Sequence, residues 1–141
     1  MQMVSRSFAM ASVLVILSMS KPATAETAVQ IIAHHIQAFR NGDVDMLVAD
    51  YADDAVFWRS NGTIKGISNI RKLFEMLTDE RSVPGRKTFE GTVERLTNDV
   101  FFEHWVMSRG TSQEKSGTDI IVMAKDKIIY QAVLPPNPAS P

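Results

Sequence analysis

The chain has 141 residues, with 16 acidic and 15 basic side chains, three histidines and no cysteine. The nearly balanced charge argues against a nucleic-acid-binding protein, because such proteins present a clustered basic surface. Without cysteine there are no disulfide bonds and no thiolate ligands, so a hydrophobic core has to stabilise the fold.

The first 25 residues have the pattern of a signal peptide. Arg6 gives a positive start, an apolar run follows over 8–19, and Ala23-Thr24-Ala25 is a small-residue cleavage site. An uncleaved anchor or a buried helix is the alternative, but the run is shorter than the roughly 20 residues that span a bilayer. We expect cleavage after Ala25 and export to the periplasm or the medium, without membrane attachment of the mature protein.

Three helices are predicted in the first half of the mature sequence. Thr27 and Gln30 form a capping-box pattern, and apolar residues then recur at helical spacing as far as Asn41-Gly42, where glycine favours a helix end. Asp43 is a capping residue for a second, short helix. Ser68 is expected to cap a third helix, which has one apolar face.

The remaining segments alternate as strands do. A hairpin is predicted at 55–65 around an Asn-Gly turn. After a linker, four antiparallel strands are predicted, over 88–96, 100–109, 117–124 and 127–134. The proline-rich tail at 135–141 is expected to be disordered. The predicted fold class is therefore α+β, with three N-terminal helices packed in a strongly curved antiparallel sheet, forming one domain over 26–134.

This order of elements is accompanied by a distinctive spacing of alanine, glycine and aspartate. Between residues 38 and 55 the chain reads A-x-x-x-G-D, eight residues, then A-D-D-A. The pattern resembles the nuclear transport factor 2-like superfamily, which includes ketosteroid isomerases and SnoaL-like polyketide cyclases. The resemblance extends over about 27–134. It implies a cone-shaped sheet with an internal cavity, but not a reaction, because one fold hosts many chemistries.

Ketosteroid isomerase requires a carboxylate base, a tyrosine and a protonated carboxylic acid. The resemblance puts these positions on Arg59, His35 and Asp119. Only Asp119 keeps the residue type, and a guanidinium does not accept protons at usable pH. We therefore expect no true ketosteroid isomerase activity.

Asp119 and His104 are the candidate catalytic residues. Asp119 lies in an otherwise apolar segment. Facing a cavity, its carboxyl group would be desolvated and its pKa raised; alternatively it bonds the amides of the 110–117 loop. His104 faces inward beside Asp119 if Glu103 faces solvent, which would create an acid–base dyad. The opposite parity puts Trp105 inside and His104 outside.

Other side chains are expected to line the cavity, although most would also fit an ordinary core: His35, Tyr51, Phe57, Arg59, Phe74 and Phe102. A buried Arg59 needs an anion, either Asp119 or a ligand carboxylate; the alternative is a solvent-facing arginine beside the turn. The adjacent His34 and His35 point about 100° apart and cannot serve one site. We expect no metal site and no cofactor.

The sequence thus predicts an exported SnoaL-like protein whose partner is a small, mostly apolar molecule. The enzyme hypothesis is proton transfer, dehydration or cyclisation; the alternative is a non-catalytic ligand-binding or dimerising module. A homodimer is expected through the outer face of the sheet, with Trp105, Met107, Ile120 and Val122 at the contact.

Overall fold

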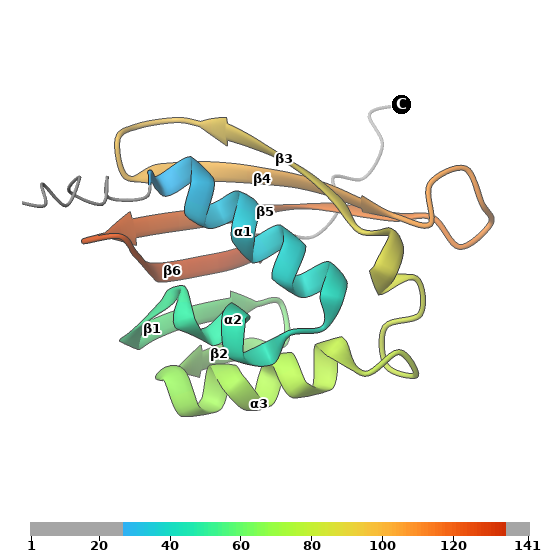
Figure 1. The fold of residues 1–141 in the computed structure, drawn as a ribbon, viewed down its shortest axis with the longest axis horizontal. Helices are drawn as coiled ribbons and strands as arrows, with labels where there is room; N and C mark the ends of the chain where they lie inside the picture. The colour runs from blue at the N-terminus through green and yellow to red at the C-terminus, as the bar shows by residue number, and fades with distance from the viewer. Residues whose placement is uncertain (1–26, 135–141) are drawn as a thin grey trace, which may run out of the picture.

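The computed structural model describes residues 27–134. The predicted signal peptide and the predicted disordered tail lie outside this range. The elements follow in the order α1 (Ala28–Asn41), α2 (Val44–Ala49), β1 (Tyr51–Arg59), β2 (Gly62–Lys65), α3 (Ile67–Thr78), η1 (Arg86–Thr88), β3 (Glu90–Arg95), β4 (Val100–Met107), β5 (Lys115–Ala124) and β6 (Lys127–Leu134), as Figure 1 shows.

The helix boundaries follow from local chemistry. Thr27 and Gln30 form the predicted capping box of α1, and Gly42 ends that helix at a φ of 74°, a left-handed conformation that suits glycine. Asp43 caps α2 by accepting a bond from the amide of Met46. The prediction for α3 was wrong in detail, because Gly66 and not Ser68 is its N-cap.

The six strands form one sheet in the order β2-β1-β6-β5-β4-β3. The predicted α+β class is confirmed: α1 and α2 precede the β1–β2 pair, and the other four strands of the curved sheet follow α3 (Figure 1). The sheet is mixed, however, because β1 and β6 pair in parallel. Almost the whole second half of the chain separates these two strands, and a connection of that length permits parallel pairing.

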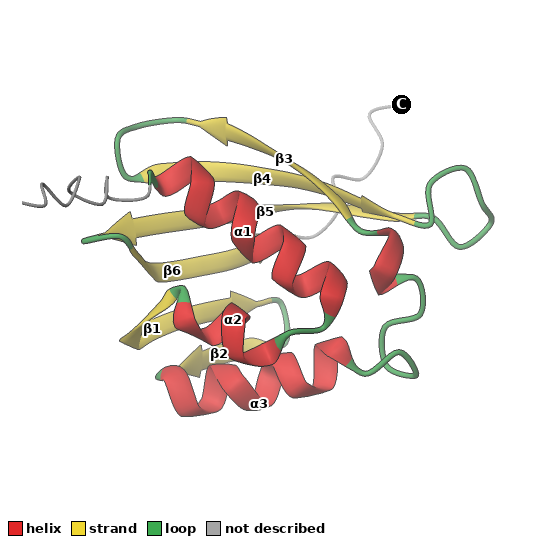
Figure 2. Cartoon of the chain, viewed as in Figure 1, coloured by secondary structure: helices red, strands yellow, loops and turns green. Residues whose placement is uncertain are grey.

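The helices cover one face of the sheet (Figure 2). The core lies between them, and its largest fully buried side chains are Ile32, Leu47, Phe57, Ile70, Phe101, Ile121 and Ile128. Burial of these residues supplies the main stabilisation of a domain without disulfides. Among residues 27–134 there is no helix that combines the length and the apolar character needed to cross a membrane.

The opposite, outer face of the sheet carries a row of apolar residues, in which Ala132 is buried and the others are half-buried. Phe102 pairs with Ile120, Ile120 with Ala132, and Ala132 with Trp58, so these side chains point to the same side. The predicted dimer residue Ile120 belongs to this face, whereas Trp105 is on the inner face. The predicted contact surface is therefore wrong in part, because it combines residues that point to opposite faces of the sheet.

Candidate functional site

A pocket of about 240 Å³ lies between the helices and the inner face of the sheet. This volume is slightly below the usual range for ligand sites, about 300–1,000 Å³, so the pocket suits only a small molecule. Most of its wall is apolar, from residues such as Phe39, Leu77 and Val133. The polar side chains in the wall are His35, Arg59, Glu103, Asp119 and Gln131. Chemistry in the pocket therefore depends on a few polar groups.

The predicted dyad requires the His104 side chain to face the pocket and the Glu103 side chain to face solvent. In strand β4 the two side chains point the other way. Glu103 is 3% exposed and lines the pocket, whereas the His104 side chain is 47% exposed on the outer face. Its neighbour Phe102 also lies on that face, so the expectation that both point into the cavity was wrong. Phe101, which is fully buried, sets the alternation. Burying this large aromatic ring carries Glu103 inward with it.

Within residues 27–134, the ring nitrogens of His104 contact outer-face side chains. Its Nδ1 lies 3.0 Å from Thr118 Oγ1, and its Nε2 lies 3.3 Å from Glu94 Oε2. The cross-strand partner of His104 is Thr118, and the partner of Asp119 is Glu103. The proposed His104–Asp119 dyad is therefore replaced by a pair of carboxyl groups, Glu103 and Asp119.

The two carboxyl groups share the inner face of adjacent strands. Residues directly opposite in such a pair have Cβ atoms about 4.5–5.5 Å apart. Burial raises the pKa of Glu103 to about 8, and the nearby Asp119 adds to this shift. Burial also raises the pKa of Asp119. Two carboxylates this close in an apolar site cannot both ionise easily, so the pair retains a proton near neutral pH.

Hydrogen bonds distinguish the two carboxyl groups. Trp105 Nε1 donates to Asp119 Oδ1 at 2.9 Å, and Gln131 Nε2 donates to Asp119 Oδ2 at 2.6 Å. These bonds oppose the effect of burial on the pKa of Asp119. No comparable donor to Glu103 is found within residues 27–134. The negative charge therefore favours Asp119 and the retained proton favours Glu103.

A further row of polar contacts fixes the orientation of Gln131. The Tyr51 hydroxyl donates to Gln131 Oε1, so the amide nitrogen faces Asp119. His35 Nε2 lies 3.5 Å from the Tyr51 oxygen, and His35 Nδ1 lies 3.2 Å from Asp50 Oδ2. Burial raises the pKa of Tyr51 well above its usual value, which keeps the phenol protonated as a donor. The row extends from Asp119 on β5 through β6, β1 and α1 to Asp50, the C-cap residue of α2.

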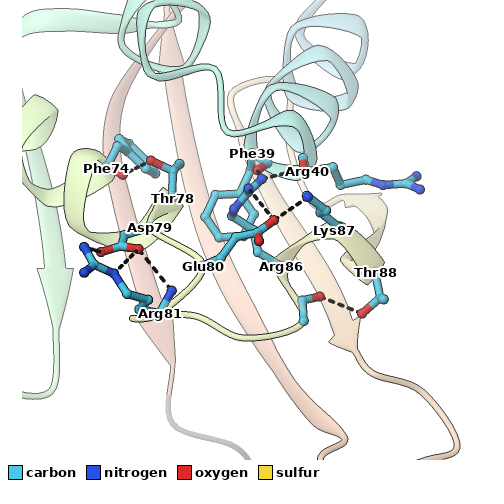
Figure 3. Close-up of polar contacts among 11 residues, drawn as sticks. Phe39, Arg40, Phe74, Thr78, Asp79, Glu80, Arg81, Arg86, Lys87 and Thr88 are labelled. Atoms are coloured by element: carbon cyan, nitrogen blue, oxygen red, sulfur yellow. Dashed lines mark hydrogen bonds and ion pairs between the residues drawn. The ribbon is translucent and has the colours of Figure 1, made fainter.

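The segment between α3 and β3 contributes Val83 to the pocket wall. Arg86 anchors this segment (Figure 3). Its Nη1 donates to the carbonyl of Phe39 at 2.8 Å and to that of Arg40. These carbonyls are at the C-terminal end of α1, where the helix dipole favours a cation. Arg86 is thus a structural residue that positions one wall.

The structure separates the predicted site residues into three groups. The pocket wall contains His35, Phe57, Arg59, Phe74 and Asp119. Tyr51 lies one layer behind the wall and contacts it through Gln131. His104 and Phe102 are on the other face of the sheet.

Sequence reasoning missed Glu103, Trp105 and Gln131 as site residues. Both of the alternating sets of side chains in β4 include aromatic residues, so alternation alone did not decide which set faces the core. The charge of Glu103 favoured the wrong choice, since an isolated carboxylate is usually solvated. Within residues 27–134, no group of three or more histidine or acidic side chains is placed to hold a metal ion.

The same fold occurs in solved structures of low sequence identity. An NTF2-like protein of unknown function from Burkholderia xenovorans LB400 is 20% identical with a TM-score of 0.61, over 76% of this chain and 80% of that chain. A candidate polyketide cyclase from Sinorhizobium meliloti is 15% identical with a TM-score of 0.58, over 74% and 93%. A de novo designed protein with a curved β-sheet is 13% identical with a TM-score of 0.65, over 81% and 89%.

These likenesses establish an NTF2-like fold and no particular activity. The SnoaL-like domain model matches residues 32–131, and the chain belongs to this family. The resemblance expected from the sequence is thereby confirmed. No curated protein matches the chain in sequence.

Proposed function

We propose that this protein is an enzyme that transfers protons on a small, mostly apolar molecule held in the pocket. Asp119 is the general base and protonated Glu103 is the general acid. The observation that carries this proposal is the pair of opposed carboxyl groups, with raised pKa values, in an otherwise apolar wall. Acids and bases with pKa values near the working pH are the most effective proton donors and acceptors.

The assigned protonation states support a balanced reaction. Asp119 removes a proton from a carbon next to a substrate carbonyl, and Glu103 gives its proton to the carbonyl oxygen. The product of this half-reaction is an enol, with Asp119 protonated and Glu103 ionised. Transfer of the Asp119 proton to another carbon, with return of the enol proton to Glu103, completes an isomerisation. In a dehydration the Asp119 proton goes instead to a hydroxyl group that leaves as water, and the enol proton again returns to Glu103. Attack of the enol carbon on a second carbonyl would give a cyclisation, the chemistry in the name of the Sinorhizobium meliloti neighbour.

The proposal can be tested without knowledge of the natural substrate. The protein is incubated in D₂O with a panel of small apolar ketones, and NMR measures both binding and loss of the proton next to the carbonyl. We expect catalysed exchange for some compounds that bind, and none with Asp119→Asn. If compounds bind but exchange stays at the buffer rate throughout, the non-catalytic ligand-binding module is the better description.

We also propose that two copies associate through the outer face of the sheet. Phe102, Ile120, Val122 and Tyr130 are half-buried there, and no helix of the described chain covers them. An apolar surface that is partly exposed to solvent in this way is typical of a protein–protein interface. Sedimentation of the mature protein should give about twice the mass of one chain.

Export remains a proposal that depends on residues 1–25. N-terminal sequencing of the exported fraction should find Glu26 as the first residue. An intact Met1 in that fraction would contradict cleavage after Ala25.

A further inference from the structure

Arg59 is the only basic side chain other than a histidine in the pocket wall formed by the described residues. It follows the buried Phe57 by two positions in β1 and shares its inward side. The residue is half-buried and lies at the end of the strand, beside the exposed Asn61-Gly62 turn. Arg59 is therefore a residue of the pocket wall that is also partly exposed to solvent.

The half-buried Arg59 differs from the buried Arg86 in its polar contacts. The Arg86 guanidinium donates to two backbone carbonyls and lies 3.9 Å from Glu80. The Nε atoms of both arginines are buried without a hydrogen-bond partner, so the difference lies in the other guanidinium nitrogens. Those of Arg86 are paired, whereas Arg59 forms no side-chain hydrogen bond or ion pair within residues 27–134. A partly desolvated cation without an anion is unfavourable, so an anion that enters the pocket would gain from this charge.

The register of the sheet places Arg59 in one row with the carboxyl pair. Trp58 pairs with Ala132 in parallel, so the next residues, Arg59 and Val133, share the inner face. Val133 pairs with Asp119, and Asp119 pairs with Glu103. Adjacent strands are about 4.8 Å apart, which puts the Arg59 backbone about 10 Å from that of Asp119. Apolar Val133 lies between the cation and the acids.

We propose that Arg59 is an anion-binding subsite and that the ligand is a small apolar carboxylic acid. Its carboxylate pairs with the guanidinium, its hydrocarbon body lies over Val133, and its reactive end reaches Asp119 and Glu103. This inference rests on the proposed function, since it identifies the substrate class of the same pocket. A carboxylate suits the site because the planar guanidinium binds it through two parallel hydrogen bonds. A doubly charged phosphate would face only one cation and an acidic pair.

The test compares two probes of nearly equal shape, 3-phenylpropionate and 3-phenylpropanamide, at pH 7. Calorimetry or ligand-observed NMR measures both dissociation constants for the wild-type protein and for Arg59→Met. Wild type should bind the carboxylate about 10- to 100-fold more tightly than the amide, the range expected for charge-assisted hydrogen bonds. Arg59→Met should lose this preference and still bind the amide.

Arg81→Met is the matched control, because its side chain is 91% exposed and it is not part of the pocket wall. It removes the same charge and should keep the full preference. Arg59→Lys keeps the positive charge but cannot form the two parallel hydrogen bonds of a guanidinium. It should retain part of the preference for the carboxylate over the amide. Thermal melts verify that each variant is folded, and the wild-type comparison needs no variant.

The outcomes separate this inference from the proposed function. Equal binding of the two probes by wild type overturns the Arg59 subsite, although the pocket still takes apolar molecules. A preference for the carboxylate that persists in Arg59→Met also overturns the Arg59 subsite. If wild type binds neither probe while the ketones of the exchange assay bind and react, the carboxylate inference is wrong and the proposed function stands. If nothing from either set binds, both proposals are wrong.

Discussion

Polar residues that are adjacent in sequence lie on opposite faces of the sheet and differ in their exposure to solvent. On β4, Glu103 is buried at the pocket and His104 is exposed on the other side. On β5, Asp119 is buried and the adjacent Thr118 contacts His104. The side chains differ by one position in sequence, but only the inner ones are removed from water. Solvent access, more than residue type, decides which of these groups is suited to catalysis.

The energetic consequence follows from the environment of each pair. The outer His104–Glu94 contact is 3.3 Å long, and the two side chains are 47% and 60% exposed. Water screens such contacts, which typically contribute about 0–1 kcal/mol. The inner Glu103–Asp119 pair is desolvated, and its pKa values are raised. Substitutions on the inner face should therefore change function, and those on the outer face should not.

The largest effect is expected from Asp119→Asn. Loss of the base should reduce the catalysed exchange rate by at least about 100-fold, since general-base catalysis typically contributes 10²–10⁴. The amide nitrogen of asparagine cannot accept the hydrogen bond that Gln131 donates to Asp119. A loss of about 1 kcal/mol of stability is therefore expected. The exchange assay in D₂O measures the first effect and urea denaturation the second.

Thr118→Ala is the control for this comparison, because it alters the adjacent residue on the outer face. Its exchange rate should match that of the wild type. A comparable loss in both variants would mean that β5 tolerates no substitution there, and the assignment of the base would lose its support.

The next effect concerns pH. The pKa of Glu103 is about 8 in the folded protein and has an ordinary value of 4.5. Between these values the folded state holds a proton that the unfolded chain has lost, so stability should fall as pH rises from about 4.5 to 8. The slope reaches at most about 1.4 kcal/mol per pH unit for one group, and it levels off above pH 8. Urea denaturation at pH 5 to 9 measures it.

Glu103→Gln should flatten this dependence, because glutamine does not titrate. Asp119 also has a raised pKa, so part of the slope should remain. Glu94→Gln, on the outer face of β3, should keep the wild-type slope. Identical slopes in wild type and Glu103→Gln would show that Glu103 does not hold a proton in the fold.

Much of this arrangement was accessible from the sequence, and the limits have physical causes. The caps of α1 and α2 depend on contacts three residues apart, so Thr27 and Asp43 were readable directly. Pocket residues on apolar stripes, such as Phe57 and Phe74, were also predicted. The parity of β4 was not, because it depends on which aromatic residues the helices cover. The parallel β1–β6 pair was missed because pairing between distant segments leaves no local pattern.

The third effect tests whether the outer face is an interface. Ile120→Lys puts a charge in the centre of the apolar row, beside Phe102 and Ala132. Burying that charge in an interface without a partner is unfavourable, so the variant should sediment as a monomer at concentrations where wild type is a dimer. The inner-face variant Asp119→Asn should remain a dimer. A wild-type protein that is monomeric at high concentration would refute the interface.

The smallest effect is expected from His104→Ala, although this residue is a plausible catalytic base by type alone. Its ring contacts Thr118 at 3.0 Å and Glu94 at 3.3 Å, both on the outer face, and it does not reach the pocket. Removing a contact this exposed should change stability by no more than about 0.5 kcal/mol. The exchange rate should stay within about twofold of wild type, because general acid–base catalysis requires hydrogen-bond reach of the reacting proton. A large loss of turnover with intact stability would place a reacting group on the outer face and reverse the assignment of the two faces.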